Sequence, residues 1–435
     1  MLADMIEIRS LLQSRGVAYD GIGTAEWWEK IANLGTPLFL EDGGLTRKVL
    51  FLWRDPQGDE IASTAASVLL DVNSITDHHS WTPVCLQRHS GTDVWFGVLE
   101  VHSQWRGSYS FIPIERHQLP DVVRDRGDGS LIAQRSWWID VAKQQTFDPF
   151  NRLPHVKSGW GLSSPLHMPN APLELGWQEW EQGSLSMVNK DRLSVIDWDS
   201  SDLTNRRSCW LFSTSIGHAP LVILLDGENW GETSGTLSVL QYLTDIRQIA
   251  PAHYLLIASI DSKTRWQELG CSHLFWSAVV FDLLPKVSAL MEVDGRGISD
   301  RLVAGQSLGG LSSLYASAYF PMFFSKVISL SGSFWWPNKA LMLDAAAVPF
   351  NPVPANSITE QILQDKVDVS HLKIYQNVGS GERGMCHLNN ATYQAIHQKG
   401  GNVKFELVHG GHDWLSWRSG LIKGLLFLMP APLQH

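Results

Sequence analysis

The sequence has few cysteines and an excess of acidic over basic residues. Its 435 residues include four cysteines, which are widely scattered and form no C-x-x-C pair. This spacing excludes a disulfide framework and predicts free thiols in a reducing compartment. The 34 Lys and Arg against 44 Asp and Glu give a formal net charge of −10. That charge disfavours nucleic-acid binding, and it requires any anionic ligand to meet a local basic cluster.

The sequence also gives no indication of a secretory signal or a membrane-spanning segment. The first residues lack the basic region and apolar run of a secretory signal. We find no apolar stretch long enough to span a bilayer. We therefore expect a soluble, cytoplasmic protein without membrane insertion, whose oligomeric state the sequence does not fix.

Apolar residues are plentiful. They make up 44% of the chain, and 20 residues are tryptophan. A chain of this length predicts about two to four domains. Tryptophan mostly packs in cores, but this richness also suits a protein that handles aromatic ligands.

The first part of the chain has a β pattern. Residues 1 to about 35 are expected to be helical, and several short strand-like segments separated by turn residues follow. These segments are residues 48–54, 67–71, 82–88, 94–101 and 107–114. We predict an immunoglobulin-like β-sandwich over about residues 38–170, in an N-terminal domain of residues 1–175. Residues 120–170 look more irregular, and residues 168–172 resemble a linker.

Two features of this domain have alternative interpretations. His78 and His79 beside Asp77 could suggest a metal site, but adjacent side chains on an extended segment point to opposite faces, so a solvated loop is favoured. The pairs 105–106 and 137–138 contain tryptophans, for which core packing is the default and a ligand-facing wall the alternative.

Residues 176–435 have an α/β pattern. A strand pair at 193–198 and 208–213 is followed by six apolar runs, and helical segments such as 275–291 lie between them. The runs are residues 221–227, 253–260, 301–304, 326–331, 373–378 and 403–408. Alternation of strands and helices predicts a mostly parallel sheet, with active-site loops at the carboxyl ends of its strands.

A G-x-S-x-G turn lies between one of these strands and a helix. Ser307 is its central serine, and residues 302–304 and 310–320 are the strand and helix around it. Side chains at Gly305 and Gly309 would clash in such a sharp turn. An ordinary glycine-rich turn is the alternative. With the parallel sheet, the turn predicts an α/β-hydrolase with Ser307 as nucleophile.

The base and the acid should follow the serine in the order acid, then histidine. We favour His412, on a glycine-rich loop after the last strand, over its neighbour His409. Asp413 is interpreted as a turn or helix cap. Glu382, after the penultimate strand, is the expected acid, with an exposed loop carboxylate as the alternative.

An oxyanion hole needs two backbone N–H donors. We expect one from Leu308, directly after the nucleophile. The other should come from Gly227 or Glu228, in the loop after residues 221–225.

Several segments together resemble the enterochelin (ferric enterobactin) esterases of enteric bacteria. They occur in the expected order over roughly residues 200–425, and they are far more specific than the serine turn alone. The matching segments are residues 224–230, 260–269, 275–276, 304–312, 331–337 and 410–420. The N-terminal module is also similar to that family's N-terminal domain, though more weakly.

The resemblance implies hydrolysis of the siderophore's trilactone to dihydroxybenzoylserine, which releases iron in the cytoplasm. It assigns Ser307, His412 and Glu382 as nucleophile, base and acid. The family often has Arg-Glu-Pro around the acid, whereas this chain has Gly-Glu-Arg. No cofactor or metal is needed, because iron arrives with the substrate.

A ferric tris-catecholate is anionic and aromatic, so its pocket should combine charge with stacking. The expected substrate-binding residues are Arg265, Arg418, Arg383, Trp230, Trp335 and Trp414. For Arg265 the alternative is a salt bridge with Glu268. For Trp335, as for its neighbour Trp336, it is packing behind the sheet.

Two other functions fit parts of this pattern. One is an esterase or acyl transferase of the same fold that acts on simpler esters. The other is a non-catalytic siderophore- or glycan-binding protein that relies on its β-sandwich.

Overall fold

In a computed structural model, most of the chain can be described. The described residues are 9, 12–13, 15–18, 20–39, 44–76, 80–127, 129–188, 192–231, 235–343, 348–350 and 352–431. They form two compact units. The first is Met1–Pro172 with His409–Leu415, and the second is Leu173–Val408 with Ser416–His435. The segment His409–Leu415, which the sequence places in the catalytic domain, therefore groups with the N-terminal unit.

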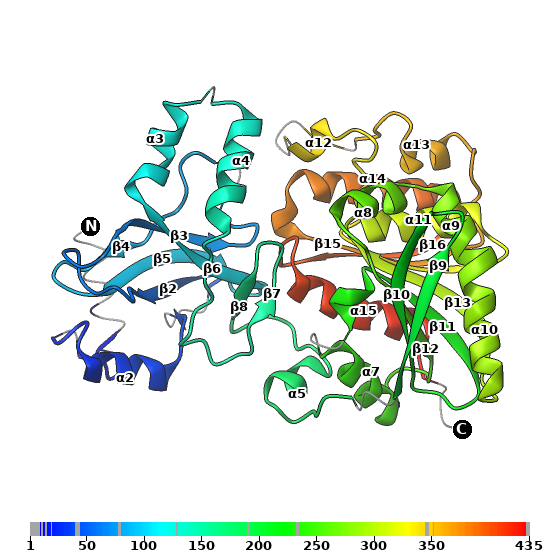
Figure 1. Ribbon diagram of the computed structural model, residues 1–435, viewed down its shortest axis with the longest axis horizontal. Coiled ribbons are helices and arrows are strands. Elements are labelled where there is room, and N and C mark those ends of the chain that lie inside the picture. Colours follow the sequence, from blue (N-terminus) through cyan, green and yellow to red (C-terminus); the bar gives the residue numbers. More distant parts are fainter. Residues whose placement is uncertain are drawn as a thin grey trace. The chain divides into compact units, whose positions relative to one another are not determined.

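The first unit contains two four-stranded antiparallel sheets (Figure 1). One has the order β1-β2-β5-β4, with strands Leu38–Phe39, Thr46–Arg54, Val94–His102 and Gln87–Arg88. The other has the order β3-β6-β8-β7, with strands Ala65–Val72, Arg106–Glu115, Leu162–His167 and Val156–Lys157. Alternate residues of β2, β3, β5 and β6 share one buried cluster, as expected of sheets packed face to face. The predicted β-sandwich is confirmed.

Helices cover parts of this sandwich. Helix α2 (Ala25–Leu34) buries Trp27, Trp28 and Ile31. Helices α3 (Pro120–Arg124) and α4 (Leu131–Ala142) lie where the sequence suggested irregular structure, which corrects that expectation. Trp137 and Trp138 of α4 are both 5% exposed and pack on residues of β3 and β6. Their core role is confirmed, as is that of Trp105. Residues 77–79, including the two histidines, lie outside the described residues.

The second unit is built on an eight-stranded sheet of order β16-β15-β14-β13-β11-β12-β10-β9. Its strands are β9 Leu193–Ser200, β10 Asn205–Ser213, β11 His218–Leu225, β12 His253–Ile257, β13 Gly297–Gln306, β14 Lys326–Leu330, β15 Lys373–Gly379 and β16 Asn402–Val408. The strands from β16 to β12 pair in parallel, and the β9–β10 hairpin adds an antiparallel edge. The predicted mostly parallel sheet is confirmed.

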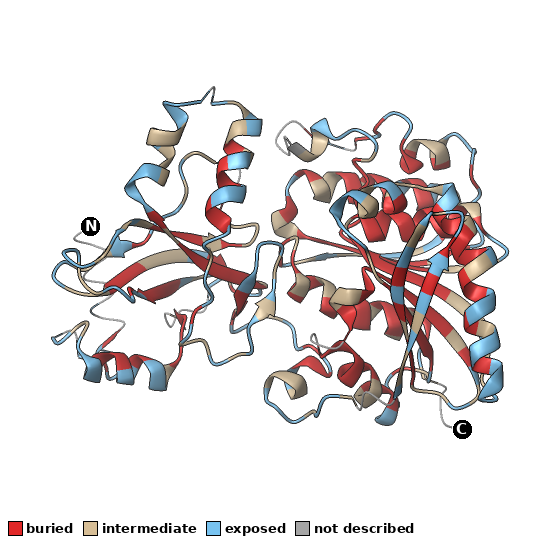
Figure 2. Cartoon of the chain, in the orientation of Figure 1, coloured by how far each residue is buried: buried red, intermediate tan, exposed pale blue. Residues whose placement is uncertain are grey.

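Helices cover both faces of this sheet (Figure 1). One face carries α8 Ser262–Leu269, α9 His273–Ala278, α11 Leu308–Tyr319 and α14 Gly384–Gln398, and the other carries α7 Thr236–Asp245 and α15 Trp414–Leu428. The remaining helices are α5 Trp177–Glu181, α6 Gly227–Trp230, α10 Leu284–Val293, α12 Ala340–Leu343 and α13 Ile358–Leu363. Helix α11 is buried along nearly its whole length (Figure 2), so the residue at its start is held in a rigid environment.

One helical stretch corrects the expectation about apolar length. His273–Val293, which joins α9, a π turn at Val279–Leu283 and α10, is long and apolar enough to cross a membrane by those criteria alone. Half of its most apolar window is buried in the protein. Phe275, Trp276 and Leu283 lie in the core cluster that α11 also contacts. The stretch therefore packs as a core element of the second unit.

Candidate active site

Four neighbouring parallel strands are followed by residues in an unusual backbone conformation. Asp226 follows β11, Ser307 follows β13 and Ser331 follows β14, with φ angles of 55°, 57° and 47°. After β15 and one short turn, Arg383 has a φ of 48°. Positive φ strains residues that have a Cβ, and such strain gathers at functional sites. The carboxyl ends of β15, β14, β13 and β11 thus mark the candidate site.

Ser307 has the geometry of a nucleophile on a strand-to-helix turn. It is the N-cap of α11, with φ 57° and ψ −120°. A Cβ on Gly305 would lie 2.6 Å from the carbonyl carbon of Gly309, so the predicted need for glycine at 305 is confirmed. A Cβ on Gly309 would meet no atom closer than 3.5 Å, so the clash expected there is wrong.

The predicted oxyanion donors lie at two helix starts. Leu308 is the first residue of α11, and Gly227 and Glu228 begin α6. The first N–H groups of a helix have no partner within it, and they lie at the positive end of its dipole. Glycine is needed at 227 for close packing and not for the turn itself. Asp226 makes the left-handed turn, whereas a Cβ on Gly227 would lie 2.6 Å from the backbone of β12.

Asp226 connects several elements behind the nucleophile. Its side chain is 1% exposed and accepts two hydrogen bonds from Arg265, at 2.6 and 2.7 Å. It also accepts a bond from Gln306 at 3.2 Å, next to Ser307. Burial acts to lower the pKa of Arg265, but the Asp226 and Glu228 carboxylates outweigh it, and the pKa is raised.

The ion pair considered for Arg265 therefore has a different partner. Arg265 binds Asp226, whereas Glu268 pairs with Arg207. The Arg265 side chain is 24% exposed. Glu228 accepts a bond from the Ser259 N–H at 2.9 Å, and burial raises its pKa.

Glu382 is a buried and fixed carboxylate, not an exposed loop charge. The residue is 5% exposed. Its Oε1 accepts bonds from the Ser331 hydroxyl at 2.6 Å and the Gly379 N–H at 2.7 Å. The indole N–H of Trp417 in turn donates to the Ser331 oxygen at 3.0 Å. Such a carboxylate is suited to orienting an imidazole.

The histidine loop belongs to the first unit. His412 is half-buried, and its backbone N–H and C=O are both bonded to the β3–β4 segment. Asp413 accepts a bond from the Leu415 N–H at 2.7 Å, so it caps the local turn as predicted. His409 stacks on His102 with ring centres 3.7 Å apart. Burial, followed by the neighbouring His102, lowers the pKa of His409.

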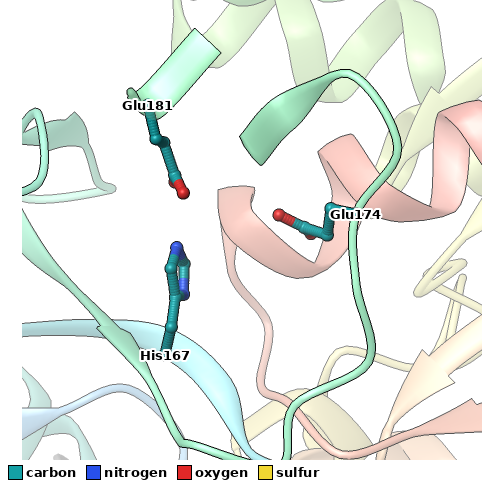
Figure 3. Close-up of side chains that lie close together, drawn as sticks. All are labelled: His167, Glu174 and Glu181. Atoms are coloured by element: carbon teal, nitrogen blue, oxygen red, sulfur yellow. The ribbon is translucent and has the colours of Figure 1, made fainter. Parts of the chain in front are cut away.

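Three expected substrate residues are buried, and two of them, Trp230 and Arg418, form hydrogen bonds in the core. Trp230 is 0% exposed and donates its indole N–H to the Leu225 carbonyl at 3.1 Å. Arg418 is 2% exposed; Glu174 accepts a bond from it at 2.5 Å and Glu181 at 2.6 Å. Figure 3 shows Glu174 on the loop before α5 and Glu181 at the end of that helix. Arg418 also lies 4.6 Å from the Trp177 ring. Both predictions of substrate contact are corrected, because neither side chain reaches the surface.

The partly exposed tryptophans beside the site are Trp336 and Trp266, not the predicted Trp335. Trp335 is 4% exposed and packs in the core, as its alternative stated, whereas Trp336 and Trp266 are half-buried. The exposed ammonium of Lys339, which our sequence analysis missed, lies 4.7 Å from the Trp266 ring and 5.7 Å from the Trp336 ring. Its only signal was a lysine shortly after the tryptophan pair. Arg383 is exposed and Trp414 is half-buried.

This surface begins beside the nucleophile. The Ser333 hydroxyl lies 3.3 Å from the Ser307 hydroxyl, and the Ser333 N–H donates to the Ser307 carbonyl at 3.0 Å. The Trp336 N–H then donates to the Ser333 carbonyl at 3.0 Å. A single turn of chain therefore links Ser307 to the Trp336–Lys339 surface.

Comparisons with known proteins match both parts of the chain. Residues 48–177 match the family described as "Enterochelin esterase, N-terminal", and residues 209–428 match "Putative esterase". The iron(III) enterobactin esterase of Dickeya dadantii is 38% identical over 414 residues, covering 94% of this chain and 93% of the relative. The protein of that name from Escherichia coli K12 is 36% identical over 426 residues, covering 95% and 98%.

Solved structures give the same result. The ferric enterobactin esterase of Salmonella typhimurium superimposes with a TM-score of 0.81 at 34% identity, covering 93% of this chain and 98% of that one. The enterobactin esterase of Shigella flexneri, crystallised in the presence of enterobactin, gives a TM-score of 0.78 at the same identity and coverage.

Proposed function

This chain belongs to the iron(III) enterobactin esterase family and is an ester hydrolase with the α/β-hydrolase fold, and on that premise we propose that it hydrolyses the trilactone of ferric enterobactin. The products are dihydroxybenzoylserine units, whose weaker chelation releases iron. The single observation that carries the mechanism is the strained Ser307 at the start of a buried helix. Free thiols at all four cysteines agree with a cytoplasmic location.

In the proposed reaction, Ser307 attacks a lactone carbonyl carbon while His412 takes the serine proton. The N–H of Leu308 and that of Gly227 or Glu228 hold the oxyanion. The ester C–O bond of the lactone then breaks, and His412 returns the proton to the departing oxygen of the siderophore's own serine unit. Water then attacks the acyl-enzyme carbonyl while His412 takes its proton, the bond to the Ser307 oxygen breaks, and His412 returns the proton to that oxygen. Glu382 orients the imidazole throughout.

Substrate charge and shape fit the surface beside the nucleophile. Ferric tris-catecholate is anionic and presents flat aromatic faces. Lys339 above the rings of Trp266 and Trp336 offers a cation and stacking surfaces together. We assign Lys339 the charge-binding role that the sequence gave to Arg418, with Arg383 as a second exposed cation. Trp414 remains a proposed contact.

Substrate preference tests this function. We expect kcat/KM for ferric enterobactin to exceed that for p-nitrophenyl acetate by about 100-fold or more, because bound catecholates position the ester. Chromatography should show dihydroxybenzoylserine. A preference for the simple ester would favour a general esterase. Tight binding of ferric enterobactin without any product would favour a binding protein.

A charge variant tests the substrate surface in the same assay. Lys339→Ala should raise KM for ferric enterobactin about 10-fold, because a partly desolvated charge contact is lost, while hydrolysis of the neutral p-nitrophenyl ester should not change. Lys366→Ala, at an exposed lysine after α13, removes the same charge elsewhere and should leave both reactions unchanged. Equal effects of the two variants would contradict the assignment.

A further inference from the structure

The loop that carries the proposed base is held by the β-sandwich through its backbone. The His412 N–H donates to the Ser74 hydroxyl at 3.1 Å, and the Asn73 amide donates to the His412 carbonyl at 3.2 Å. Ser74 and Asn73 therefore bond to the N–H and the C=O of His412. A Cβ on Gly411 would lie 2.3 Å from the Asn73 side-chain oxygen, so this approach requires glycine.

A second anchor lies one residue further on. The Asp413 Oδ2 accepts bonds from the Ser108 N–H at 2.9 Å and from the Ser108 hydroxyl at 2.5 Å. Ser108 is 3% exposed and Asp413 is 4% exposed. Hydrogen bonds to a buried carboxylate are stronger than neutral ones and fix its position. The negative charge of Asp413 also acts on Asp71, whose pKa is raised to about 6, chiefly by burial.

A third contact ties the start of the loop to the same strand. The Arg106 N–H donates to the His409 carbonyl at 2.9 Å, and Arg106 and Gly410 form an isolated parallel bridge. Strand β6 thus contacts the loop at both Arg106 and Ser108. The stacked pair of His102 and His409 adds a side-chain contact from β5.

We propose that the N-terminal β-sandwich is a positioning element for catalysis, in which Ser108, through Asp413, and the Asn73–Ser74 pair hold His412 in its working orientation. This inference rests on the proposed function, since it assumes that His412 is the base. It gives the sandwich a part in the chemical step. A general base displaced by about 1 Å loses about 100-fold in rate, so anchors of this kind control kcat.

The test uses the full-length protein and ferric enterobactin. Asp413→Ala, which removes the bonds that the carboxylate accepts from Ser108 and Leu415, should lower kcat about 100-fold. Ser108→Ala, which removes only the hydroxyl bond, should lower it about 10-fold. KM should stay within about twofold in both, because a positioning residue does not touch substrate. Ser108→Thr keeps the hydroxyl and should restore most of kcat.

A matched control lies on the same strand. Ser110 is 1% exposed and two residues beyond Ser108 on β6. Ser110→Ala should leave kcat unchanged, with a thermal midpoint like that of Ser108→Ala. Asn73→Ala offers an independent route to the same loop and should lower kcat about 10-fold with KM unchanged.

The two proposals fail in different ways. If Ser307→Ala retains wild-type hydrolysis, the proposed function fails. If Ser307→Ala is inactive but Asp413→Ala, Ser108→Ala and Asn73→Ala keep wild-type kcat, only the positioning role is overturned. A kcat that falls equally in Ser110→Ala, or a failure of Ser108→Thr to recover, would also overturn it.

Discussion

Replacing Ser307 with alanine is expected to lower kcat for ferric enterobactin by about 10³–10⁶-fold, with the fold intact. The hydroxyl is the only group lost, and the helix start and the glycine contact behind it remain. Binding of the iron-loaded siderophore should persist, since the proposed charge and stacking contacts lie elsewhere. Tryptophan fluorescence titration and product chromatography together measure both effects.

A glycine variant provides the control for this prediction. With φ 57° and ψ −120°, Ser307 holds strain that serine and alanine share but glycine does not. Ser307→Gly should therefore be as inactive as Ser307→Ala but more stable than it by about 1 kcal/mol, after allowance for the backbone entropy of glycine. A glycine variant less stable than the alanine variant would show that position 307 is not strained.

Removing Arg418 should have the largest effect on stability. Its guanidinium lies between Glu174 and Glu181 in the interior, and Glu174 is only 7% exposed. Arg418→Ala leaves a buried carboxylate without its cation, at a cost of about 3–5 kcal/mol in the free energy of unfolding. Urea unfolding followed by tryptophan fluorescence would measure it.

A paired variant separates charge burial from packing. Arg418→Met with Glu174→Gln removes the cation and the buried charge together, so it should recover much of the loss. KM for ferric enterobactin should stay near wild type in the folded protein. A raised KM with unchanged stability would restore the substrate-binding role that the sequence suggested for Arg418.

Local patterns predicted the elements of the site well. Ser307, its flanking strand and helix, and the apolar strands β11, β13 and β14 all follow from short runs of residues. Each depends on neighbours in the sequence, through strand burial and turn sterics. The sandwich strands were recognisable for the same reason. Helix α4 was missed because its tryptophans and polar residues follow no clear helical periodicity.

Long-range partners were not predictable from these patterns. Arg418 lies 244 residues from Glu174, and nothing near Arg418 in the sequence indicated that it pairs with a buried carboxylate. Likewise, Asp413 meets Ser108 across 305 residues. Trp230 and Trp335 differ from the half-buried Trp336 only in the direction that packing gives them. Burial and pairing depend on the assembled sheet, which a single sequence does not reveal.

The covalent intermediate tests the central claim most directly. Wild-type protein mixed with ferric enterobactin, quenched in acid within one turnover and digested, would be analysed by mass spectrometry. We predict a dihydroxybenzoylseryl ester on the peptide that contains Ser307, absent from Ser307→Ala. Consumption of the substrate with an acyl group on another residue, or with none on Ser307 at any quench time, would contradict the account.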